Sequence, residues 1–376
     1  MPHSASLVVI AVLCLAASQS SAAPTVPAIH AKEVPLPTGI KSVTSIAGLA
    51  DNHVYFIADD LVYFYDGRQA KRLVQQPLCV STFGDGQSMY PVNISDSEMQ
   101  AQSEKYRKGL PKIAGDGRFN VVRFQALGVQ AGIVTLYGSG DYYDARGGVL
   151  SPVWGRFLPG GFRCEGKLPG YGGAVEDAAT DGESYFLVPA VYGTPHLSFD
   201  PNLYAYAQLP ESFVPGGVTA SGPHEVWTWA NNGNAVYHLN GFAWDVRPIE
   251  GLATVLRVVG DGHGRAFALG LEEAPVSQSA EQPVPLLFHW DGQAWLRLTV
   301  PTGFKLQAGG LLAKDADFVE LVGASGSWYK WWQGQFTAET GPDILVQSSW
   351  RSPNGHSIVA GENQGSVKLF VIGGDK

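Results

Sequence analysis

The sequence predicts an all-β fold, and two features of the chain support this expectation. Its 376 residues include 46 glycines and 24 prolines, while only 16% are charged. Long, strongly helical proteins use more charged residues and less glycine. Aromatic runs such as "LFHWDGQAWLRL" (Leu287–Leu298) also contain Asp-Gly or Asn-Gly pairs, which are the strongest short-range signal for a β-hairpin. The chain is therefore expected to consist of many short strands joined by tight turns.

A repeated unit runs through the chain, and its clearest copy is "GGVTASGPHEVWTWANNGNAVYHLNGFAWDVRPIEG" (Gly216–Gly251). Each copy holds four candidate strands, named a to d in chain order. Repeated four-stranded units of roughly 40 residues are typical of β-propeller blades. The sequence therefore predicts a β-propeller of seven four-stranded blades. Six or eight blades stay open, because the first interval is wide enough to hold one more. The copies begin near residues 42, 119, 173, 217, 256, 308 and 345.

Three of the expected c–d turns carry an Asp-Gly or Asn-Gly pair, at Asp66-Gly67, Asn240-Gly241 and Asp291-Gly292. Such pairs favour a two-residue type I′ hairpin, in which both central residues have positive φ. We therefore expect each pair to join strands c and d directly.

The last copy, from residue 345, ends after strand c. The segment "KEVPLPTG" (Lys32–Gly39) resembles the end of a d strand. We expect Val34–Thr38 to lie beside Val367–Ile372 and to complete the last blade, which would leave no loose edge between the two ends of the chain.

Two copies share a pattern within strands b, c and d. The residues that carry it are Val226, Trp227, Tyr237, Asn240, Gly241 and Trp244 in one copy and Asp291, Gly292 and Trp295 in the next. This pattern resembles the repeats of tectonin-type and WD-like β-propellers. The resemblance implies a sugar-binding or surface-recognition module, and it covers two or three blades.

The N-terminus predicts export. Leu7–Ala17 is an apolar run of the length found in signal peptides. The small residues that follow it, up to residue 22, suit a cleavage site. We expect residues 1–22 to be a signal peptide, or alternatively an uncut anchor, and residues 28–376 to form one propeller domain. The mature protein would then be secreted, periplasmic or bound at the cell surface, without a membrane span. Its two cysteines, Cys79 and Cys164, are expected to form a disulfide, the alternative being two separate thiols.

The longest segments between expected strands all fall on one face of the ring, which carries the b–c and d–a loops. They are Pro77–Arg118, Gly155–Gly172, Pro189–Asn202 and Leu271–Pro285. Within the inserted segment 77–118, Ser95 and Glu98 form a capping box, which predicts a short helix over Asp96–Lys108. Because loops on a rigid scaffold often carry function, we expect this b–c/d–a face to be the working face.

The charge of the chain argues against nucleic acid as a partner. The formal net charge is −9, and no run of Lys or Arg is present. Phosphate neutralisation needs clustered cations. No phosphate loop, metal-ligand spacing or nucleophile motif occurs either, so we expect no cofactor, no metal ion and no catalytic residue.

The sequence thus favours an exported, non-catalytic propeller that binds a carbohydrate or a protein on its loop-rich face, although enzymatic activity stays open. One alternative is a glycoside hydrolase or lyase with acidic residues at the axial channel. Another is a structural module of the cell envelope. Aromatic rings can stack on sugars or anchor interfaces. The candidate ligand-binding residues, all in the long segments, are Asp85, Tyr90, Tyr106, Tyr171, Tyr192 and His196.

Overall fold

The structure is a computed structural model, and it describes the backbone of most of the chain from residue 29 to residue 373. Between β6 and β14 it describes only some of the side chains. The described ranges are 29–59, 61–73, 79–80, 89–90, 118–130, 133–144, 147–158, 161–167, 175–180, 185–189, 197–199, 213, 215–222, 225–230, 232–240, 243–272, 285–315, 318–323, 326–332, 334–352 and 354–373.

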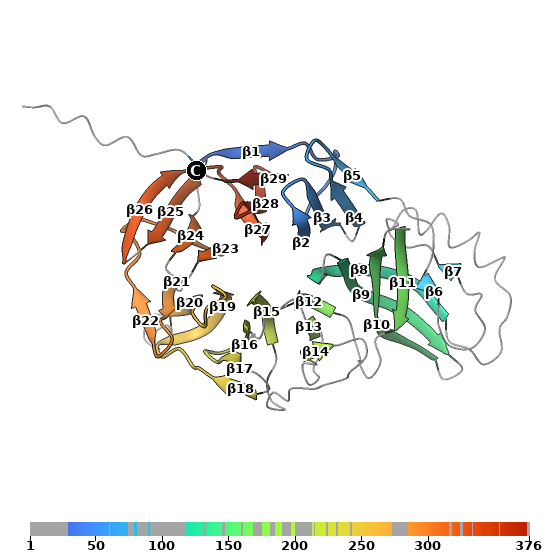
Figure 1. The fold of residues 1–376 in the computed structure, drawn as a ribbon, viewed down its shortest axis with the longest axis horizontal. Helices are drawn as coiled ribbons and strands as arrows, with labels where there is room; N and C mark the ends of the chain where they lie inside the picture. The colour runs from blue at the N-terminus through green and yellow to red at the C-terminus, as the bar shows by residue number, and fades with distance from the viewer. Residues whose placement is uncertain are drawn as a thin grey trace, which may run out of the picture.

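The described chain is all-β, as predicted, and its sheets follow one another along the sequence (Figure 1). The first three sheets are β2 (Val43–Ala50), β3 (His53–Ala58), β4 (Leu61–Tyr65) and β5 (Ala70–Arg72); β8 (Arg118–Gln130), β9 (Ile133–Asp144), β10 (Gly147–Leu158) and β11 (Gly161–Lys167); and β12 (Val175–Thr180), β13 (Tyr185–Pro189) and β14 (Leu197–Phe199). β6 (Cys79–Val80) and β7 (Met89–Tyr90) form a separate two-stranded sheet, which lies beside β11 and β8.

The later sheets repeat the same antiparallel order, from the innermost strand outward. They are β15 (Pro215–Gly222), β16 (Glu225–Ala230), β17 (Val236–Asn240) and β18 (Ala243–Val246); β19 (Leu252–Gly260), β20 (Ala266–Glu272), β21 (Pro285–Trp290) and β22 (Trp295–Leu298); β23 (Leu306–Asp315), β24 (Phe318–Gly323), β25 (Ser327–Trp332) and β26 (Gln335–Thr340); and β27 (Leu345–Arg351), β28 (Ser357–Asn363), β29 (Ser366–Ile372) and β1 (Ala31–Val34).

The prediction of seven four-stranded blades is wrong, because the described residues form six of them. The sheet of β12, β13 and β14 has three strands. Its strand β13 ends at Pro189, a residue that has no backbone N–H to donate to a sheet, and residues 200–212, which follow β14, lie outside the described residues.

The sheets are arranged as a ring around a central axis. Each sheet is open, and the ring arises because every innermost strand contacts the next one, in the order β2, β8, β12, β15, β19, β23, β27 and back to β2. Figure 1 shows the same circular arrangement. The predicted pairing of the two chain ends is confirmed, since β1 lies antiparallel to β29, but the predicted bounds Val34–Thr38 are wrong: the paired strand is Ala31–Val34, in which Val34 pairs with Leu369.

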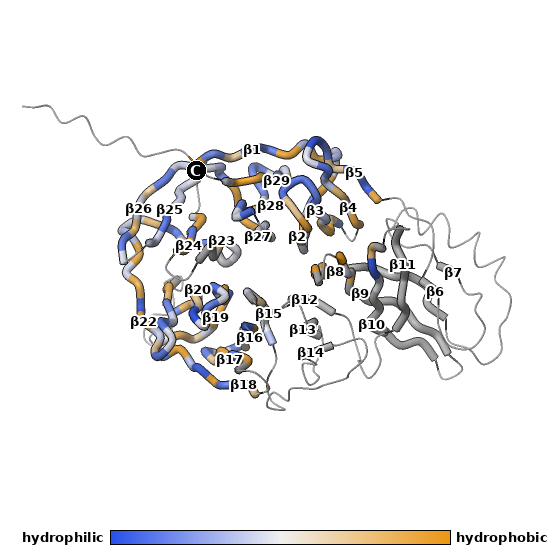
Figure 2. The backbone as a smooth tube through the Cα atoms, in the orientation of Figure 1, coloured by the Kyte–Doolittle hydropathy of each residue, from blue (hydrophilic) through white to orange (hydrophobic). Residues whose placement is uncertain are grey.

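Hydrophobic residues fill the space between neighbouring sheets. One core cluster joins Trp227 of β16 to Val258 of β19, and another joins Trp328 of β25 to Val359 of β28. In Figure 2 hydrophobic positions recur along the described strands between hydrophilic ones, as expected for strands with alternating side-chain directions. The tectonin-like residue Trp227 is fully buried and Tyr237 nearly so, which means that they pack the sheets together.

Polar side chains tie each innermost strand to its neighbour at four junctions of the described ring. Ser45 accepts a hydrogen bond from the backbone N–H of Leu127 at 3.0 Å. Asp177, Gln307 and Gln347 accept from Val218, Val346 and Val43 in the same way, at 3.0, 2.8 and 2.9 Å. The inner edge of each sheet would otherwise leave backbone donors unpaired, which costs free energy away from water. The sequence therefore supplies one acceptor side chain per junction at these places.

A cluster of hydrogen bonds closes the junction between the first sheet and the last. Nδ1 of His356 lies 2.7 Å from Oδ2 of Asp51, which also accepts a hydrogen bond from Nδ2 of Asn354 at 3.0 Å. Burial by itself would raise the pKa of Asp51, but hydrogen bonds from Ser352, Asn354 and His356 outweigh burial and hold the pKa below its usual value. The carboxylate therefore stays charged and keeps the two sheets together.

The predicted type I′ turns are wrong at Asp66 and Asp291. In each case four residues, instead of two, separate the last paired residues of the two strands, because the aspartate side chain accepts two backbone N–H groups. Oδ1 of Asp66 accepts from Arg68 and Gln69, and Oδ1 of Asp291 accepts from Gln293 and Ala294. Only the glycines have positive φ, +88° at Gly67 and +104° at Gly292. Asp side chains favour such local turns. The same hydrogen bonds lower the pKa of both aspartates.

The predicted d–a loop Gly155–Gly172 is also wrong in its first two thirds. The described strands β10 and β11 continue to Lys167. Cys164 therefore lies in the outermost strand of its sheet, while Cys79 lies in β6, which is close to β11. The side chains of both cysteines lie outside the described residues.

Several further predictions fall outside the described residues, including the signal peptide at 1–22 and the helix at Asp96–Lys108. In the part of the chain that is described, no helix has the length and apolar character needed to cross a membrane.

Candidate functional site: the axial cavity

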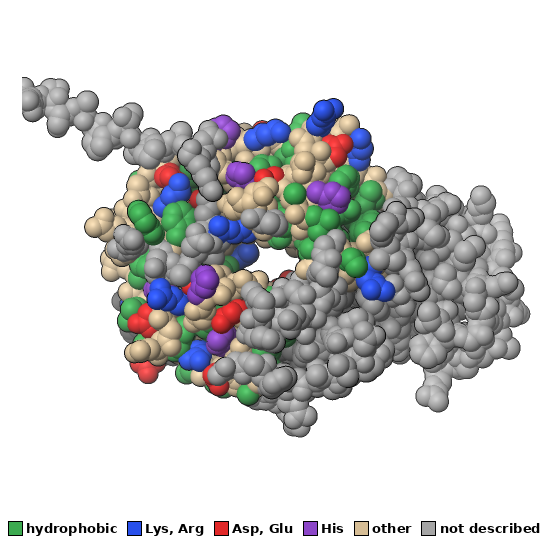
Figure 3. All heavy atoms as spheres, in the orientation of Figure 1, with side chains coloured by type: hydrophobic (Ala, Val, Ile, Leu, Met, Phe, Trp, Pro, Cys, Tyr) green, Lys and Arg blue, Asp and Glu red, His purple; other side chains and the backbone are tan. Residues whose placement is uncertain are grey.

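The innermost strands surround a cavity of about 620 Å³ on the axis of the ring. Each of the seven sheets of the ring contributes to its wall, through β2, β8, β12, β15, β19, β23 and β27. Figure 3 shows an opening at the centre of the ring. Sites for small molecules commonly enclose roughly 300–1,000 Å³. The cavity is therefore large enough to hold a small ligand.

Arg257 is the cationic side chain among the described residues that line the cavity. It belongs to β19, and its Nη2 donates a hydrogen bond to Oγ of Ser349 on β27 at 3.0 Å. Because β23 stands between these two strands in the ring, the side chain reaches across part of the cavity. Burial lowers the pKa of Arg257, and the charge of Asp177 partly reverses this effect. A guanidinium stays protonated at neutral pH in any case.

Asp177 is the carboxylate among the described residues of the same wall. It lies on β12, and its Oδ2 accepts the backbone N–H of Val218 on β15. Asp177 therefore has a structural role between two sheets. It also places a negative charge near Arg257, so that the cavity carries one charge of each sign.

Two tryptophans form parts of the cavity wall, Trp229 and Trp350. A glycine on a neighbouring strand makes room for each indole. A Cβ atom on Gly217 would lie within 2.6 Å of Cη2 of Trp229, and a Cβ atom on Gly48 would lie 3.1 Å from Cη2 of Trp350. Trp229 is buried, while Trp350 is half-buried and offers part of its ring to the cavity.

β-Bulges near the start of the innermost strands direct residues toward the axis. The register shifts after Val43 in β2, after Pro215 in β15 and after Val346 in β27. The residues at these shifts, Thr44, Gly216 and Gln347, all line the cavity. Bulges re-aim side chains in this way next to functional sites.

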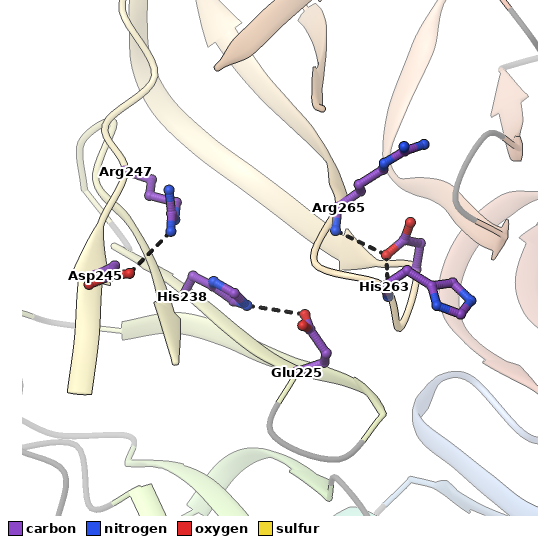
Figure 4. Close-up of polar contacts among 7 residues, drawn as sticks. Glu225, His238, Asp245, Arg247, His263 and Arg265 are labelled. Atoms are coloured by element: carbon purple, nitrogen blue, oxygen red, sulfur yellow. Dashed lines mark hydrogen bonds and ion pairs between the residues drawn. The ribbon is translucent and has the colours of Figure 1, made fainter. Parts of the chain in front are cut away.

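A second polar cluster lies away from the axis, on the face of the β15–β18 sheet that packs against the sheet of β19–β22 (Figure 4). Nε2 of His238 lies 3.1 Å from Oε2 of Glu225, and the imidazole stacks on Trp227 with ring centroids 4.1 Å apart. Arg247 pairs with Asp245 at 3.1 Å and lies 4.4 Å over the ring of Trp290. The contacts Glu225–His238 and Asp245–Arg247 lie within the β15–β18 sheet, and the contact of Arg247 with Trp290 joins this sheet to the next.

The described residues contain no group of three or more His, Cys, Asp or Glu side chains that could hold a metal ion.

The candidate ligand residues predicted from the sequence lie outside this description. Of the six, the structure places only the backbone of Tyr90, in β7. Asp85, Tyr106, Tyr171, Tyr192 and His196 lie outside the described residues. Sequence reasoning missed Arg257. The available signal was a single basic residue inside the apolar run "LRVV" (Leu256–Val259) of an innermost strand.

Comparison with known proteins identifies the fold of this chain, but it does not identify a family. No protein-family model matches the sequence, and no curated protein matches it. A solved structure described as YCF48 bound to D1 peptide is similar, with a TM-score of 0.57 and 12% identity over 93% of this chain and 100% of that chain.

Two further solved structures are similar to a comparable extent. A chain of the mitotic checkpoint complex gives a TM-score of 0.51 at 11% identity, covering 98% of this chain and 99% of that chain. The β-propeller domain of Cps50 (Swd1) from Myceliophteria thermophila gives 0.50 at 8% identity, covering 90% and 98%. At such identities the likeness shows the β-propeller fold alone. It agrees with the WD-like part of the predicted resemblance, and the tectonin-type part stays a prediction.

Proposed function

We propose that the chain is a non-catalytic β-propeller that binds a protein partner on its b–c/d–a face. The observation that carries this proposal is the length of the strands in the second sheet. β8, β9 and β10 have 13, 12 and 12 residues, whereas the corresponding strands β15, β16 and β17 have 8, 6 and 5.

The extra length lies on the b–c/d–a face. The a–b end of β8 is the part that packs in the ring, because Leu127 bonds to Ser45 and contacts the core of the first sheet. The register then continues away from the ring to the pairs Phe119–Tyr142 and Arg118–Tyr143. At about 3.3 Å per residue, an excess of roughly six residues extends a strand by about 20 Å.

This extension offers backbone groups to a partner. β11 pairs with β10 only over Val153–Leu158. Among the described strands, the stretch Gly147–Pro152 of β10 pairs on one side, with β9. An extended segment of another protein can add to such an edge through main-chain hydrogen bonds. An edge of this kind supports a protein partner over a glycan.

The alternative of a glycoside hydrolase has a specific requirement in this fold. Hydrolysis of a glycosidic bond needs two carboxyl groups on either side of the bond. A second acid would have to act beside Asp177 in the axial cavity.

Export and the Cys79–Cys164 disulfide belong to the same proposal. The apolar run Leu7–Ala17 supports export, and the closeness of β6 to β11 supports the disulfide. An exported propeller would meet its partner outside the cytoplasm.

Trimming the extension tests the proposed face. In the trimmed variant, residues 141–150 are replaced by Asn-Gly, which joins the paired residues Gly140 and Ser151 through a two-residue hairpin. The wild-type protein and the trimmed variant are immobilised and exposed to envelope extract, and the bound proteins are quantified by mass spectrometry. We expect at least one protein to be bound by the wild type and lost, by tenfold or more, with the trimmed variant.

The control is Gln293→Lys in an exposed c–d turn on the opposite face, which should bind as the wild type does. Equal binding by the trimmed variant would contradict the proposal. A glycan array probed with both proteins gives a further outcome: sugar binding that is lost on trimming would assign the face to a glycan instead.

A further inference from the structure

We propose that the axial cavity binds a saccharide that carries one carboxylate, with Arg257 holding the carboxylate. This site is separate from the proposed protein-binding extension, and either can exist without the other.

The first argument is the position of the Arg257 guanidinium. It is partly buried inside the cavity, where Nη2 is oriented by its hydrogen bond to Ser349. Guanidinium groups present several donors in a planar fork that matches a carboxylate, and such charge-assisted hydrogen bonds are stronger in a site shielded from water. A carboxylate that entered the cavity would therefore find a cation already held in place.

The second argument is the chemistry of the remaining wall. The side chains of Thr44, Ser45, Thr219, Ser348 and Ser349 bring hydroxyl groups to the cavity. A hydroxyl both donates and accepts hydrogen bonds, which suits the hydroxyl groups of a sugar. Trp350 adds a half-buried aromatic surface, against which the apolar face of a sugar ring can pack.

The third argument concerns the number of charges. Asp177 carries the opposite charge on the same wall and is coupled electrostatically to Arg257. Its carboxylate repels a ligand with several negative charges, since like charges at short distance repel one another. The cavity therefore favours an acid with one charge and neutral polar groups, such as a uronic acid, over a polyanion.

The size of the cavity agrees with this class of ligand. About 620 Å³ accommodates one or two sugar rings and is within the range of small-molecule sites. A folded protein partner cannot enter such a space, so the cavity and the edge of β10 bind different classes of partner.

Isothermal titration calorimetry of the full mature chain tests the proposal, with galacturonate, galactose, acetate and citrate as probes. We expect the wild type to bind galacturonate at least about tenfold more tightly than each of the other three. Arg257→Met should weaken galacturonate binding by about tenfold or more, which is the size expected for a lost hydrogen bond to a charged group.

The matched control is Arg297→Met, an arginine of the outermost strand β22 whose side chain is 57% exposed. It should bind galacturonate as the wild type does. Arg257→Lys keeps the positive charge and lacks the planar fork of donors, and it serves as a second variant in case Arg257→Met loses galacturonate binding through misfolding. Unfolding curves of all variants are recorded alongside. If Arg257→Met folds and binds galacturonate unchanged, or if galactose or acetate binds as tightly as galacturonate, the proposal is overturned. Absence of any galacturonate binding to the wild type at millimolar concentration overturns it as well.

Discussion

Replacement of Gln307 by alanine is expected to lower the free energy of unfolding by roughly 3–5 kcal/mol. Gln307 is buried, and its side chain makes three hydrogen bonds with backbone groups. Nε2 donates to the carbonyl oxygens of Gly323 at 2.7 Å and Ile344 at 2.8 Å, and Oε1 accepts from the N–H of Val346 at 2.8 Å. Each buried group left without a partner costs about 1–3 kcal/mol. The variant should therefore weaken the junction between the β23–β26 sheet and the last sheet.

Urea unfolding of Gln307→Ala and of the wild type measures this effect. The matched control is Gln293→Ala, since Gln293 is exposed and contributes its backbone N–H, which alanine keeps, to the turn at Asp291. We expect the control to stay within about 0.5 kcal/mol of the wild type, as is usual for surface positions. A Gln307→Ala variant as stable as the control would show that side chains do not hold the innermost strands together.

Replacement of Trp328 by alanine is expected to cost about 3–5 kcal/mol, the usual cost of removing a large aromatic side chain from a core. The indole is fully buried between β25 and the last sheet, where it packs in a cluster with Ile344 and Val359. Its Nε1 also donates to the carbonyl oxygen of Pro342 at 3.0 Å. The space left behind cannot close, because the two sheets are fixed by their neighbours in the ring.

Trp332 is the matched control for this variant, since it lies on the same strand and is 57% exposed. Trp332→Ala should change the free energy of unfolding by less than about 1 kcal/mol. Thermal and urea unfolding of the two variants measure the difference. Equal losses at the two positions would contradict the burial of Trp328 between the last two sheets.

The repeat could be predicted from the sequence because its strands carry local signals. The innermost strands begin at Val43, Pro215, Leu252 and Leu345, within a few residues of the predicted starts of the copies. The alternation of Trp227 and Trp229 with smaller residues marked strand β16. Such patterns reflect side chains that face a neighbouring sheet on each side of a strand, and they can be read without knowledge of the rest of the chain.

The long strands of the second sheet could not be predicted, because their sequence contains residues that usually end a strand. "GGVLSPVWGRFLPGG" (Gly147–Gly161) includes two prolines and several glycines, so its second half reads as a loop. In the structure Pro152 lies within β10, opposite Ser139, and the strand continues to Leu158. A proline is tolerated at a strand position whose backbone N–H would not take part in the sheet's hydrogen bonds. Which positions these are depends on the neighbouring strands.

The turns and the cavity show the same limit. The Asp-Gly pairs correctly marked the c–d turns, but the carboxylate of Asp66 or Asp291 captures two backbone N–H groups, which makes a four-residue turn. The single basic residue Arg257 in an apolar run did not reveal its role, since that role arises from Ser349 and Asp177, which belong to other sheets. A cavity built from single residues of separate strands depends on the assembled ring.

The most direct test of this account is a cross-link between the two ends of the chain. Cysteines replace Glu33 and Phe370, which are paired across β1 and β29, in a background whose native cysteines are changed to serine. Paired residues of antiparallel strands are close enough for a disulfide. We predict that the Glu33–Phe370 pair cross-links fully on mild oxidation and raises the midpoint of thermal unfolding, while Glu33→Cys combined with Arg297→Cys does not cross-link. Two free thiols at 33 and 370 in the folded, oxidised protein would contradict a propeller completed by its N-terminal strand.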